Sequence, residues 1–138
     1  MEHVIAGYLT DVWEMSRWLY DSQCGFGPGY SCESQLVTVC HNISDSMDEG
    51  VRTDAIIIEF SKAFNSVPHD RLLTKIVAIR VDLRVGVWVK EFLLGWSQTV
   101  TVDRQLSEEV RVTSGEPQGN VLGPLLFLTY VNDIWRNN

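Results

Sequence analysis

The sequence predicts an α/β (α+β) fold in which helices pack on an incomplete small sheet. Three observations carry this prediction: several segments with helical periodicity, one unbroken apolar run at residues 55–60, and two alternating segments separated by a polar turn. With 138 residues and 45% apolar content, the chain can build one hydrophobic core. No repeat, low-complexity tract or linker divides it, so we expect residues 1–138 to form a single domain.

Two amphipathic helices are expected in the first third of the chain. Residues 2–20 place apolar side chains three and four positions apart, and this helix should end near Asp21 and Ser22. The stretch "GFGPGYSC" must be a loop, and Ser31 is well placed to cap a second helix that runs to about Met47. The apolar face of that second helix consists of Leu36, Cys40, Ile43 and Met47.

Three cysteines lie eight residues apart in this region, at Cys24, Cys32 and Cys40. Their spacing fits neither a CxxC metal site nor a disulfide framework. We therefore expect three buried thiols.

The run at residues 55–60 is typical of a central strand that is covered on both faces. It ends on an acid, Glu59, and two interpretations of that acid remain open. A carboxylate at the exit of a buried strand can bind Mg2+, or the strand can simply reach water at this point.

The second half of the chain is expected to hold three helices and a hairpin. Pro68 suits the first turn of a helix with Asn65 or Ser66 as its cap, and charged neighbours of this turn should be exposed. Those neighbours are Lys62, His69, Asp70 and Arg71, and His69 is not expected to act as a ligand. A helix on Val85, Trp88, Phe92 and Trp96 follows, then a hairpin in "TVTVDRQLSEEVRVTSG", then an apolar helix from about Val121 to Trp135.

Two loops could carry chemistry or could be ordinary connections. In "SGEPQGNVLG", glycines let the backbone approach a neighbour closely, and Gln118 offers an amide. This loop suits a phosphate or a base edge, but any helix-entry loop could look the same. In the earlier loop, we expect Gln23, Phe26 and Tyr30 to pack on the core rather than to contact a ligand.

The net charge of −7 argues against a free-standing protein that grips nucleic acid, because such binding depends on Lys and Arg. The longest apolar stretch is too short to span a bilayer, and the first residues lack a basic leader region. We therefore expect an intracellular, soluble protein without a membrane partner.

Three ordered stretches together resemble the reverse transcriptases of non-LTR, LINE/jockey-like retrotransposons. They are "YDSQCGFGPGYSCESQL", "DAIIIEFSKAFNSVPHDRLL" and "VTSGEPQGNVLGPLLFLTYVNDI", and the resemblance covers nearly the whole chain. It implies a partial right-hand polymerase fold made of fingers and palm. It also implies an RNA-directed DNA polymerase with Mg2+ as cofactor and an RNA template, a DNA primer and dNTPs as partners. The implied reaction is nucleotidyl transfer, in which a primer 3′-OH attacks the α-phosphate of a dNTP.

The resemblance also implies roles for individual residues. Glu59 aligns with the catalytic, metal-binding Asp of the family. Phe64 matches the aromatic residue that stacks under the incoming sugar and excludes ribonucleotides, and Asn65 follows it where the family has a second Asp. Pro117, Gln118 and Gly119 match the loop around the nascent base pair. The implied substrate-binding set is therefore Phe64, Asn65, Pro117, Gln118 and Gly119.

The sequence departs from the family pattern at several of these positions. Glu59 is one methylene longer than Asp, which displaces the carboxylate by about 1 Å. Gly27 replaces an Arg, Glu116 and Asn120 replace a small apolar residue and a Ser, and the acid at position 116 is expected to face a polyanion. Asp103 and Arg104 stand where relatives often have a tight Asn-Gly turn, which makes the hairpin less favoured.

Two functional interpretations follow from these departures. The family's second metal-binding motif, an Asp-Asp hairpin, lies downstream of "YVNDI", and this motif and the thumb are not among residues 1–138. We therefore expect a reverse transcriptase fragment that is inactive as this chain. The alternative is a degenerate or co-opted, non-catalytic remnant that binds a protein partner or associates with itself.

Overall fold

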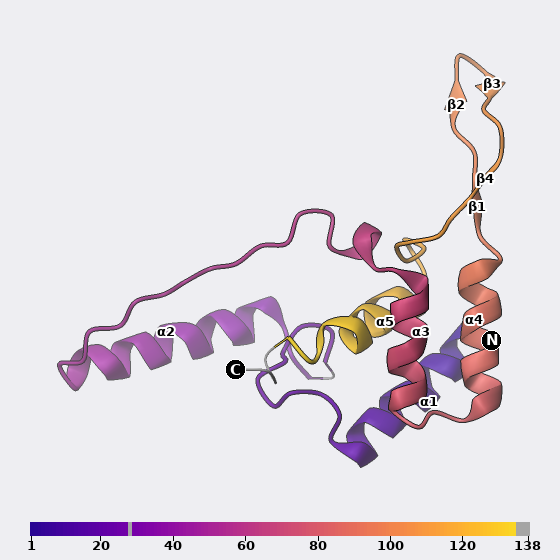
Figure 1. Cartoon of the computed structure of the whole chain (residues 1–138). Helices are drawn as coiled ribbons and strands as arrows, with labels where there is room; N and C mark the ends of the chain where they lie inside the picture. Colours follow the sequence, from indigo (N-terminus) through magenta and orange to yellow (C-terminus); the bar gives the residue numbers. More distant parts are fainter. Residues whose placement is uncertain (28, 135–138) are drawn as a thin grey trace. The chain divides into compact units, whose positions relative to one another are not determined.

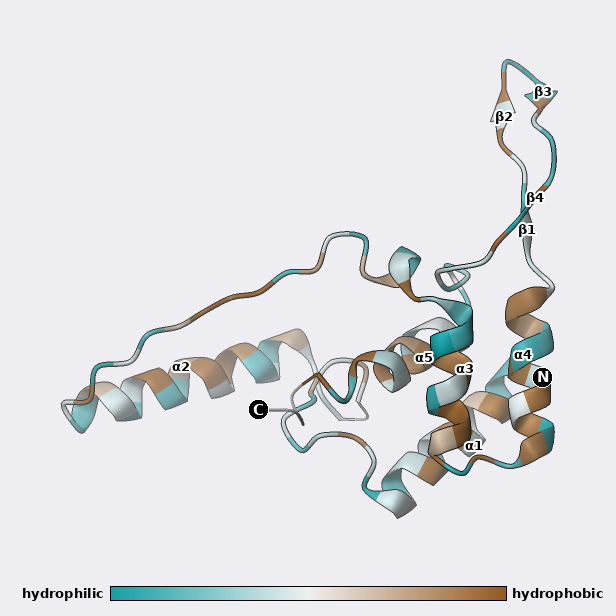
Figure 2. Cartoon of the chain, in the orientation of Figure 1, coloured by the Kyte–Doolittle hydropathy of each residue, from teal (hydrophilic) through white to brown (hydrophobic). Residues whose placement is uncertain are grey.

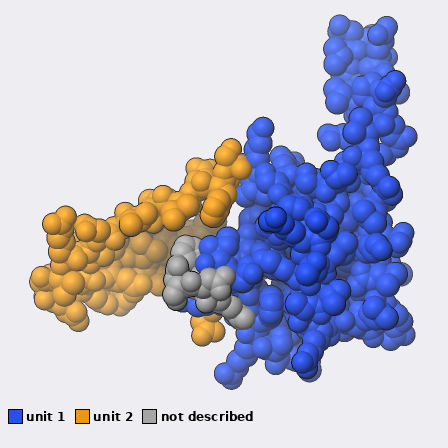
Figure 3. Space-filling view, in the orientation of Figure 1, with its two compact units in different colours: residues 1–20, 62–138 blue, residues 21–61 orange. Residues whose placement is uncertain are grey.

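The computed structural model of the chain describes residues 1–27 and 29–134. It divides into two compact units, one formed by residues 1–20 with 62–138 and the other by residues 21–61 (Figure 3). The described part is mostly helical, with five α-helices, one short 3-10 helix and two small two-stranded sheets (Figure 1).

The larger unit contains four helices, and the sequence predicted each of them. They are α1 (Glu2–Ser16), α3 (His69–Ala78), α4 (Leu83–Leu94) and α5 (Leu122–Val131). Two boundaries differ from expectation. Helix α1 ends at Ser16 because Arg17 adopts a left-handed conformation with φ 47°, and Trp96 lies beyond the end of α4. The predicted end of the last helix, Trp135, lies outside the described residues.

The start of α3 is also built differently from the prediction. Asn65 does not cap α3, and neither does Ser66, because both belong to the short 3-10 helix η1 (Phe64–Ser66). Pro68 stands at the N-cap position instead and makes no side-chain capping bond. Since proline has no N–H to satisfy, this start costs the helix little.

The core of this unit lies where α3 packs against α4 and α5, and where α1 packs against α5. Its fully buried side chains are mainly leucines from these four helices. They include Leu9, Leu72, Ile76, Val89, Leu93, Leu122, Leu126 and Leu128. Helix α5 is apolar on most of its surface (Figure 2), as expected for a helix with neighbours on more than one side.

The predicted hairpin is confirmed and follows α4 directly (Figure 1). Strand β1 (Ser97–Gln98) pairs with β4 (Val110–Arg111), and β2 (Thr101–Val102) pairs with β3 (Gln105–Leu106), both antiparallel. The two turn residues, Asp103 and Arg104, have φ values of 50° and 64°. Positive φ at both central positions is the geometry of a type I′ turn, so two non-glycine residues occupy positions that favour Asn-Gly.

The smaller unit contains α2 (Cys32–Asp48), whose start the sequence predicted correctly. The Ser31 hydroxyl accepts a hydrogen bond from the Ser34 N–H at 3.1 Å, and the Ser34 hydroxyl accepts one from the Ser31 N–H at 2.9 Å. This is a reciprocal capping box.

No residue of α2 is buried. The prediction of three buried thiols is therefore wrong, because Cys32 and Cys40 are exposed and Cys24 is only half-buried. The thiols are exposed because nothing within this unit covers the apolar face of the helix. Phe26 and Tyr30, which we expected to pack on the core, are also exposed.

The predicted central strand at residues 55–60 is also wrong. This segment has no regular secondary structure, and its side chains are exposed, with Ile57 at 93%. A strand exists through hydrogen bonds to a neighbouring strand, and none of the described residues pairs with this segment. The expected α/β arrangement around it is replaced by helices and the two small sheets.

None of the helices in the described ranges has the length and apolar character needed to cross a membrane.

Candidate functional site

The residues singled out in the sequence fall in both units. Phe64, Asn65 and the turn at residues 117–119 belong to the larger unit, whereas Glu59 belongs to the smaller one. The larger unit brings its members together.

The backbone of residues 64–68 lies directly against the loop that begins at Ser114. The Gly115 N–H donates to the Val67 carbonyl at 2.8 Å, and the Glu116 N–H donates to the Phe64 carbonyl at 3.1 Å. Pro68 and Ser114 form an antiparallel bridge. These contacts place two segments that are about fifty residues apart in the sequence side by side.

Gly115 makes this approach possible. It has φ +83°, and a Cβ atom at this position would lie 2.9 Å from both the Cα and the carbonyl oxygen of Asn65. Such distances are too short for any side chain, so only glycine allows the loop to sit this close to Asn65. Gly115 is one of the glycines that were predicted to approach a neighbour closely. The neighbour is the protein's own backbone at Asn65.

Phe64 and the Pro117–Gln118–Gly119 turn line one small pocket of about 210 Å³. The Phe64 ring is half-buried and stacks on Phe127 of α5, with ring centroids 4.2 Å apart and an interplanar angle of 28°. Helix α5 thus fixes the aromatic ring, and the loop ahead of α5 supplies most of the other lining residues. The structure brings together four of the five residues expected to bind substrate.

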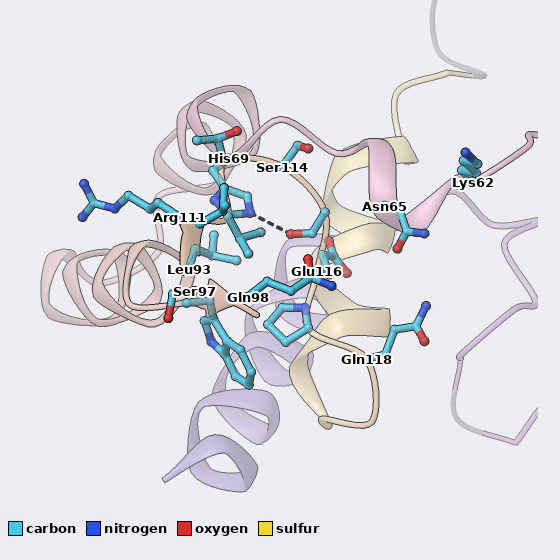
Figure 4. A pocket seen from close by; sticks show the side chains of 16 residues that line it. Lys62, Asn65, His69, Leu93, Ser97, Gln98, Arg111, Ser114, Glu116 and Gln118 are labelled. Carbon is cyan, nitrogen blue, oxygen red and sulfur yellow. Dashed lines mark hydrogen bonds between the residues drawn. The ribbon is translucent and has the colours of Figure 1, made fainter. Parts of the chain in front are cut away.

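Asn65 lines a different and larger pocket of about 830 Å³, together with Pro117 and Gln118 (Figure 4). This pocket reaches the base of the hairpin and includes two exposed cations, Lys62 and Arg111. Asn65 and Gln118 are both exposed. Gln118 lines both pockets, so its amide can reach a ligand in either one.

Asn120 closes the turn between the loop and α5. Its side-chain oxygen accepts a hydrogen bond from the Gly123 N–H at 2.5 Å, and its side-chain N–H donates to the Pro117 carbonyl. The asparagine that stands where the family has Ser therefore ties the turn to the first residues of the helix, as a capping residue does.

Glu116 is buried, which overturns the expectation that its carboxylate faces a polyanion. It is only 6% exposed, and neither carboxylate oxygen makes a hydrogen bond of normal geometry to any of the described residues. Burial raises the pKa of Glu116 to about 8. The backbone N–H of Phe127 lowers this pKa, but by less than burial raises it. This acid is therefore largely protonated at neutral pH and adds little negative charge to the pocket walls.

His69 was expected to be exposed, and this is also wrong. It is 4% exposed at the first position of α3, and its Nε2 lies 2.6 Å from the Gly115 carbonyl oxygen (Figure 4). No local pattern predicts this contact, because its two partners are 46 positions apart. The apolar periodicity of α3 was the only available signal, since His69 lies three and seven positions before the buried Leu72 and Ile76.

Glu59 lies in the irregular and exposed segment of the smaller unit. A two-metal site needs several carboxylates that converge on one point. Among the described residues, no group of three or more His, Cys, Asp or Glu side chains could hold a metal ion. The described residues therefore do not form a magnesium site by themselves.

The comparisons with a family model and with individual known proteins agree on one family. The chain matches the model of a family described as "Reverse transcriptase (RNA-dependent DNA polymerase)" over residues 1–138. It is similar to the probable RNA-directed DNA polymerase from transposon BS of Drosophila melanogaster, with 32% identity over 96% of this chain and 15% of that protein. It is also similar to the probable RNA-directed DNA polymerase from transposon X-element of the same species, with 30% identity over 96% of this chain and 14% of that protein.

A further relative is the RNA-directed DNA polymerase from mobile element jockey of Drosophila funebris, with 25% identity over the whole chain and 15% of that protein. The chain therefore spans about 15% of the length of the curated relatives it matches. No solved structure matches it.

Proposed function

We propose that this chain, which belongs to the reverse transcriptase (RNA-dependent DNA polymerase) family, supplies the nucleotide-facing part of the fingers and palm of a non-LTR retrotransposon polymerase. Its work is to bind and orient a deoxynucleotide during RNA-templated DNA synthesis. The observation that carries the proposal is the small pocket that Phe64 lines together with the Pro117–Gln118–Gly119 turn.

Each wall of this pocket suits one part of a nucleotide. An aromatic ring held by stacking offers a flat apolar surface to a sugar, and its fixed position leaves little room for an extra 2′-hydroxyl. The turn presents backbone groups and the amide of Gln118, which can meet a base edge. Glu116 belongs to this loop, and its neutral form avoids placing a full negative charge near the phosphates.

The family uses Mg2+, but the described residues do not form a site for it. The single candidate ligand, Glu59, carries one methylene more than Asp, and a displacement of about 1 Å can cost about a hundredfold in rate. We therefore propose that residues 1–138 alone do not synthesise DNA.

The experiment that tests this function is a chimera. Residues 1–138 replace the matching segment of the jockey polymerase of Drosophila melanogaster, to which the chain is 27% identical over 97% of its length. Primer extension on an RNA template is measured with Mg2+. We expect slow extension with Glu59, and extension about a hundredfold faster with Glu59→Asp.

The matched control is Glu49→Asp, which shortens an exposed acid just after α2 and should leave the rate of the chimera unchanged. A folded Glu59→Asp chimera that fails to extend primers would contradict the proposed function.

A second candidate function is a non-catalytic remnant that binds protein. It is favoured by the exposed apolar side chains of the smaller unit, among them Leu36 and Val37 of α2 and Ile56 and Ile57 beyond it. Exposed apolar surface of this kind favours association. Sedimentation velocity tests self-association: the 138-residue chain should form larger species as its concentration rises, and Ile57→Asp should reduce them. A monomer at all concentrations, unaffected by Ile57→Asp, would remove self-association as a role.

A further inference from the structure

Residues 64–69 and the loop from Ser114 are joined by three hydrogen bonds and one β-bridge. Two of the hydrogen bonds run between backbone atoms, from Gly115 to Val67 and from Glu116 to Phe64. The third comes from the side chain of His69 and ends on the Gly115 carbonyl (Figure 4). Of these three bonds, only the third depends on which side chain the sequence provides.

The chemistry of the His69 contact is defined by its acceptor. A carbonyl oxygen can only accept a hydrogen bond, so His69 must carry a proton on Nε2 and donate it to Gly115. The other ring nitrogen, Nδ1, is buried and makes no hydrogen bond within the described residues. His69 therefore acts as a single donor whose direction is set by the ring.

The ring itself is held by the core. His69 begins α3, and the next turns of this helix place Leu72 and Ile76 in the centre of the larger unit. A side chain that is 4% exposed on an anchored helix has little freedom to change its rotamer. The hydrogen bond therefore fixes the Gly115 carbonyl, two residues before Pro117, relative to α3.

We propose that His69 is a positioning residue that holds the loop at a fixed distance from Phe64 and thereby sets the width of the small pocket. This inference rests on the proposed function, in which that pocket receives the incoming deoxynucleotide. Its consequence is that His69 contributes to nucleotide affinity and to discrimination against ribonucleotides without touching the nucleotide.

Three substitutions separate the hydrogen bond from the bulk of the side chain. His69→Gln places an amide N–H near the position of Nε2, whereas the side chain of His69→Asn is too short for its amide N–H to reach the carbonyl. His69→Phe keeps a ring without a donor. The matched control is Thr74→Ala, on the exposed side of α3, where the hydroxyl bonds only to Asp70 within the helix.

The first measurement is amide hydrogen exchange in the 138-residue chain, by NMR. The N–H groups of Gly115 and Glu116 should exchange about two- to tenfold faster in His69→Phe and His69→Asn, because both variants lose one hydrogen bond. They should remain near the native rate in His69→Gln and Thr74→Ala. If His69→Phe does not fold, the amide exchange rates of His69→Gln and His69→Asn are compared. Equal rates in these two variants would overturn the proposal.

The second measurement is steady-state kinetics in the Glu59→Asp chimera. We expect KM for dNTP to rise about two- to tenfold in His69→Asn with kcat nearly unchanged, and the preference for dNTP over rNTP to fall by a similar factor. His69→Gln should restore both values. Equal KM and equal sugar discrimination in the chimera with native His69, with His69→Gln and with His69→Asn would overturn the positioning role.

The two measurements keep the two proposals apart. A folded Glu59→Asp chimera with native His69 that does not extend primers contradicts the proposed function, and with it the effect of His69 on nucleotides. Amide exchange in the 138-residue chain then still decides whether His69 holds the loop.

Discussion

The rings of Phe64 and Phe127 lie face to face with their centroids 4.2 Å apart. Through this pair, the first residue of η1 is held against α5, a helix that begins nearly sixty residues later. Because α5 contributes Leu122, Leu126 and Leu128 to the core, the position of Phe64 is coupled to the stability of the larger unit.

Replacing Phe127 should therefore weaken this unit. Stacked aromatic pairs contribute about 0.5–1.5 kcal/mol beyond the area they bury. We expect Phe127→Leu to lower the free energy of unfolding by about 1–2 kcal/mol in urea titrations followed by tryptophan fluorescence. Phe60→Leu, at an exposed ring in the smaller unit, is the control and should change nothing. Equal effects of the two substitutions would show that the stacked pair contributes no stability.

Two glycines of the loop provide a test of the close backbone approach. Gly115 and Gly119 both have φ +83°, but a Cβ would clash with Asn65 only at Gly115, and nothing lies within 4 Å of one at Gly119. Gly119→Ala should cost about 1 kcal/mol for the left-handed conformation alone. Gly115→Ala should cost at least about 2 kcal/mol more, as measured by the same urea titrations. If the two costs are equal, the loop does not lie against Asn65.

The buried Glu116 predicts a pH dependence of stability. Burial raises its pKa from 4.5 to about 8, so between these values the folded state binds more protons than the unfolded state. Stability should then fall as the pH rises from about 4.5 to 8, with a total effect on the order of 5 kcal/mol.

Substitution at this position isolates the effect. Glu116→Gln should remove this contribution, so that the free energy of unfolding above pH 8 is higher than in the native protein. Glu91→Gln, at an exposed position on α4, is the matched control and should retain the decline with pH. A native protein whose stability does not fall over this window would show that Glu116 is not buried as a neutral acid.

The tip of the hairpin should respond to a single glycine. Arg104 has φ 64° in a turn where both central residues are left-handed, a conformation that costs a non-glycine residue about 1–2 kcal/mol. Arg104→Gly should therefore strengthen the β2–β3 pairing, with slower amide exchange at Val102 and Gln105. Gln105→Gly, one position further and inside β3, should weaken the same pairing. Faster exchange in Arg104→Gly would contradict this geometry.

The elements that the sequence predicted correctly depend on local signals. The capping of α2 by Ser31 involves residues three positions apart, and the helical periodicity of α3 and α4 lies within single segments. The hairpin is also local, because its strands are joined by a two-residue turn. Such patterns can be read from short windows of sequence.

The elements that were wrong depend on partners elsewhere in the chain. The apolar run at 55–60 has the composition of a buried strand, but a strand also needs a neighbour, which no composition supplies. The thiols of Cys32 and Cys40 lie on a helix whose apolar face is uncovered in its unit. In each case the apolar character of the segment was recognised correctly, but the neighbours expected to bury it are not among the described residues of its unit.

The candidate site shows the same division. Motif resemblance predicted substrate-binding roles for Phe64 and Pro117–Gly119. In the structure these residues line one pocket, and their roles stay predictions. The resemblance could not identify His69 or the burial of Glu116, because both depend on contacts between the start of α3 and the loop before α5. The role of Glu59 as a metal ligand stays a prediction.

In the proposed function, Phe64 faces the sugar of an incoming deoxynucleotide. The most direct test is ribonucleotide incorporation by the Glu59→Asp chimera with Phe64 and with Phe64→Val. A smaller side chain should admit the 2′-hydroxyl, so we predict that rNTP incorporation rises at least about tenfold relative to dNTP incorporation. An unchanged preference for dNTP, with DNA synthesis intact, would contradict the account, because Phe64 would then not lie beside the sugar.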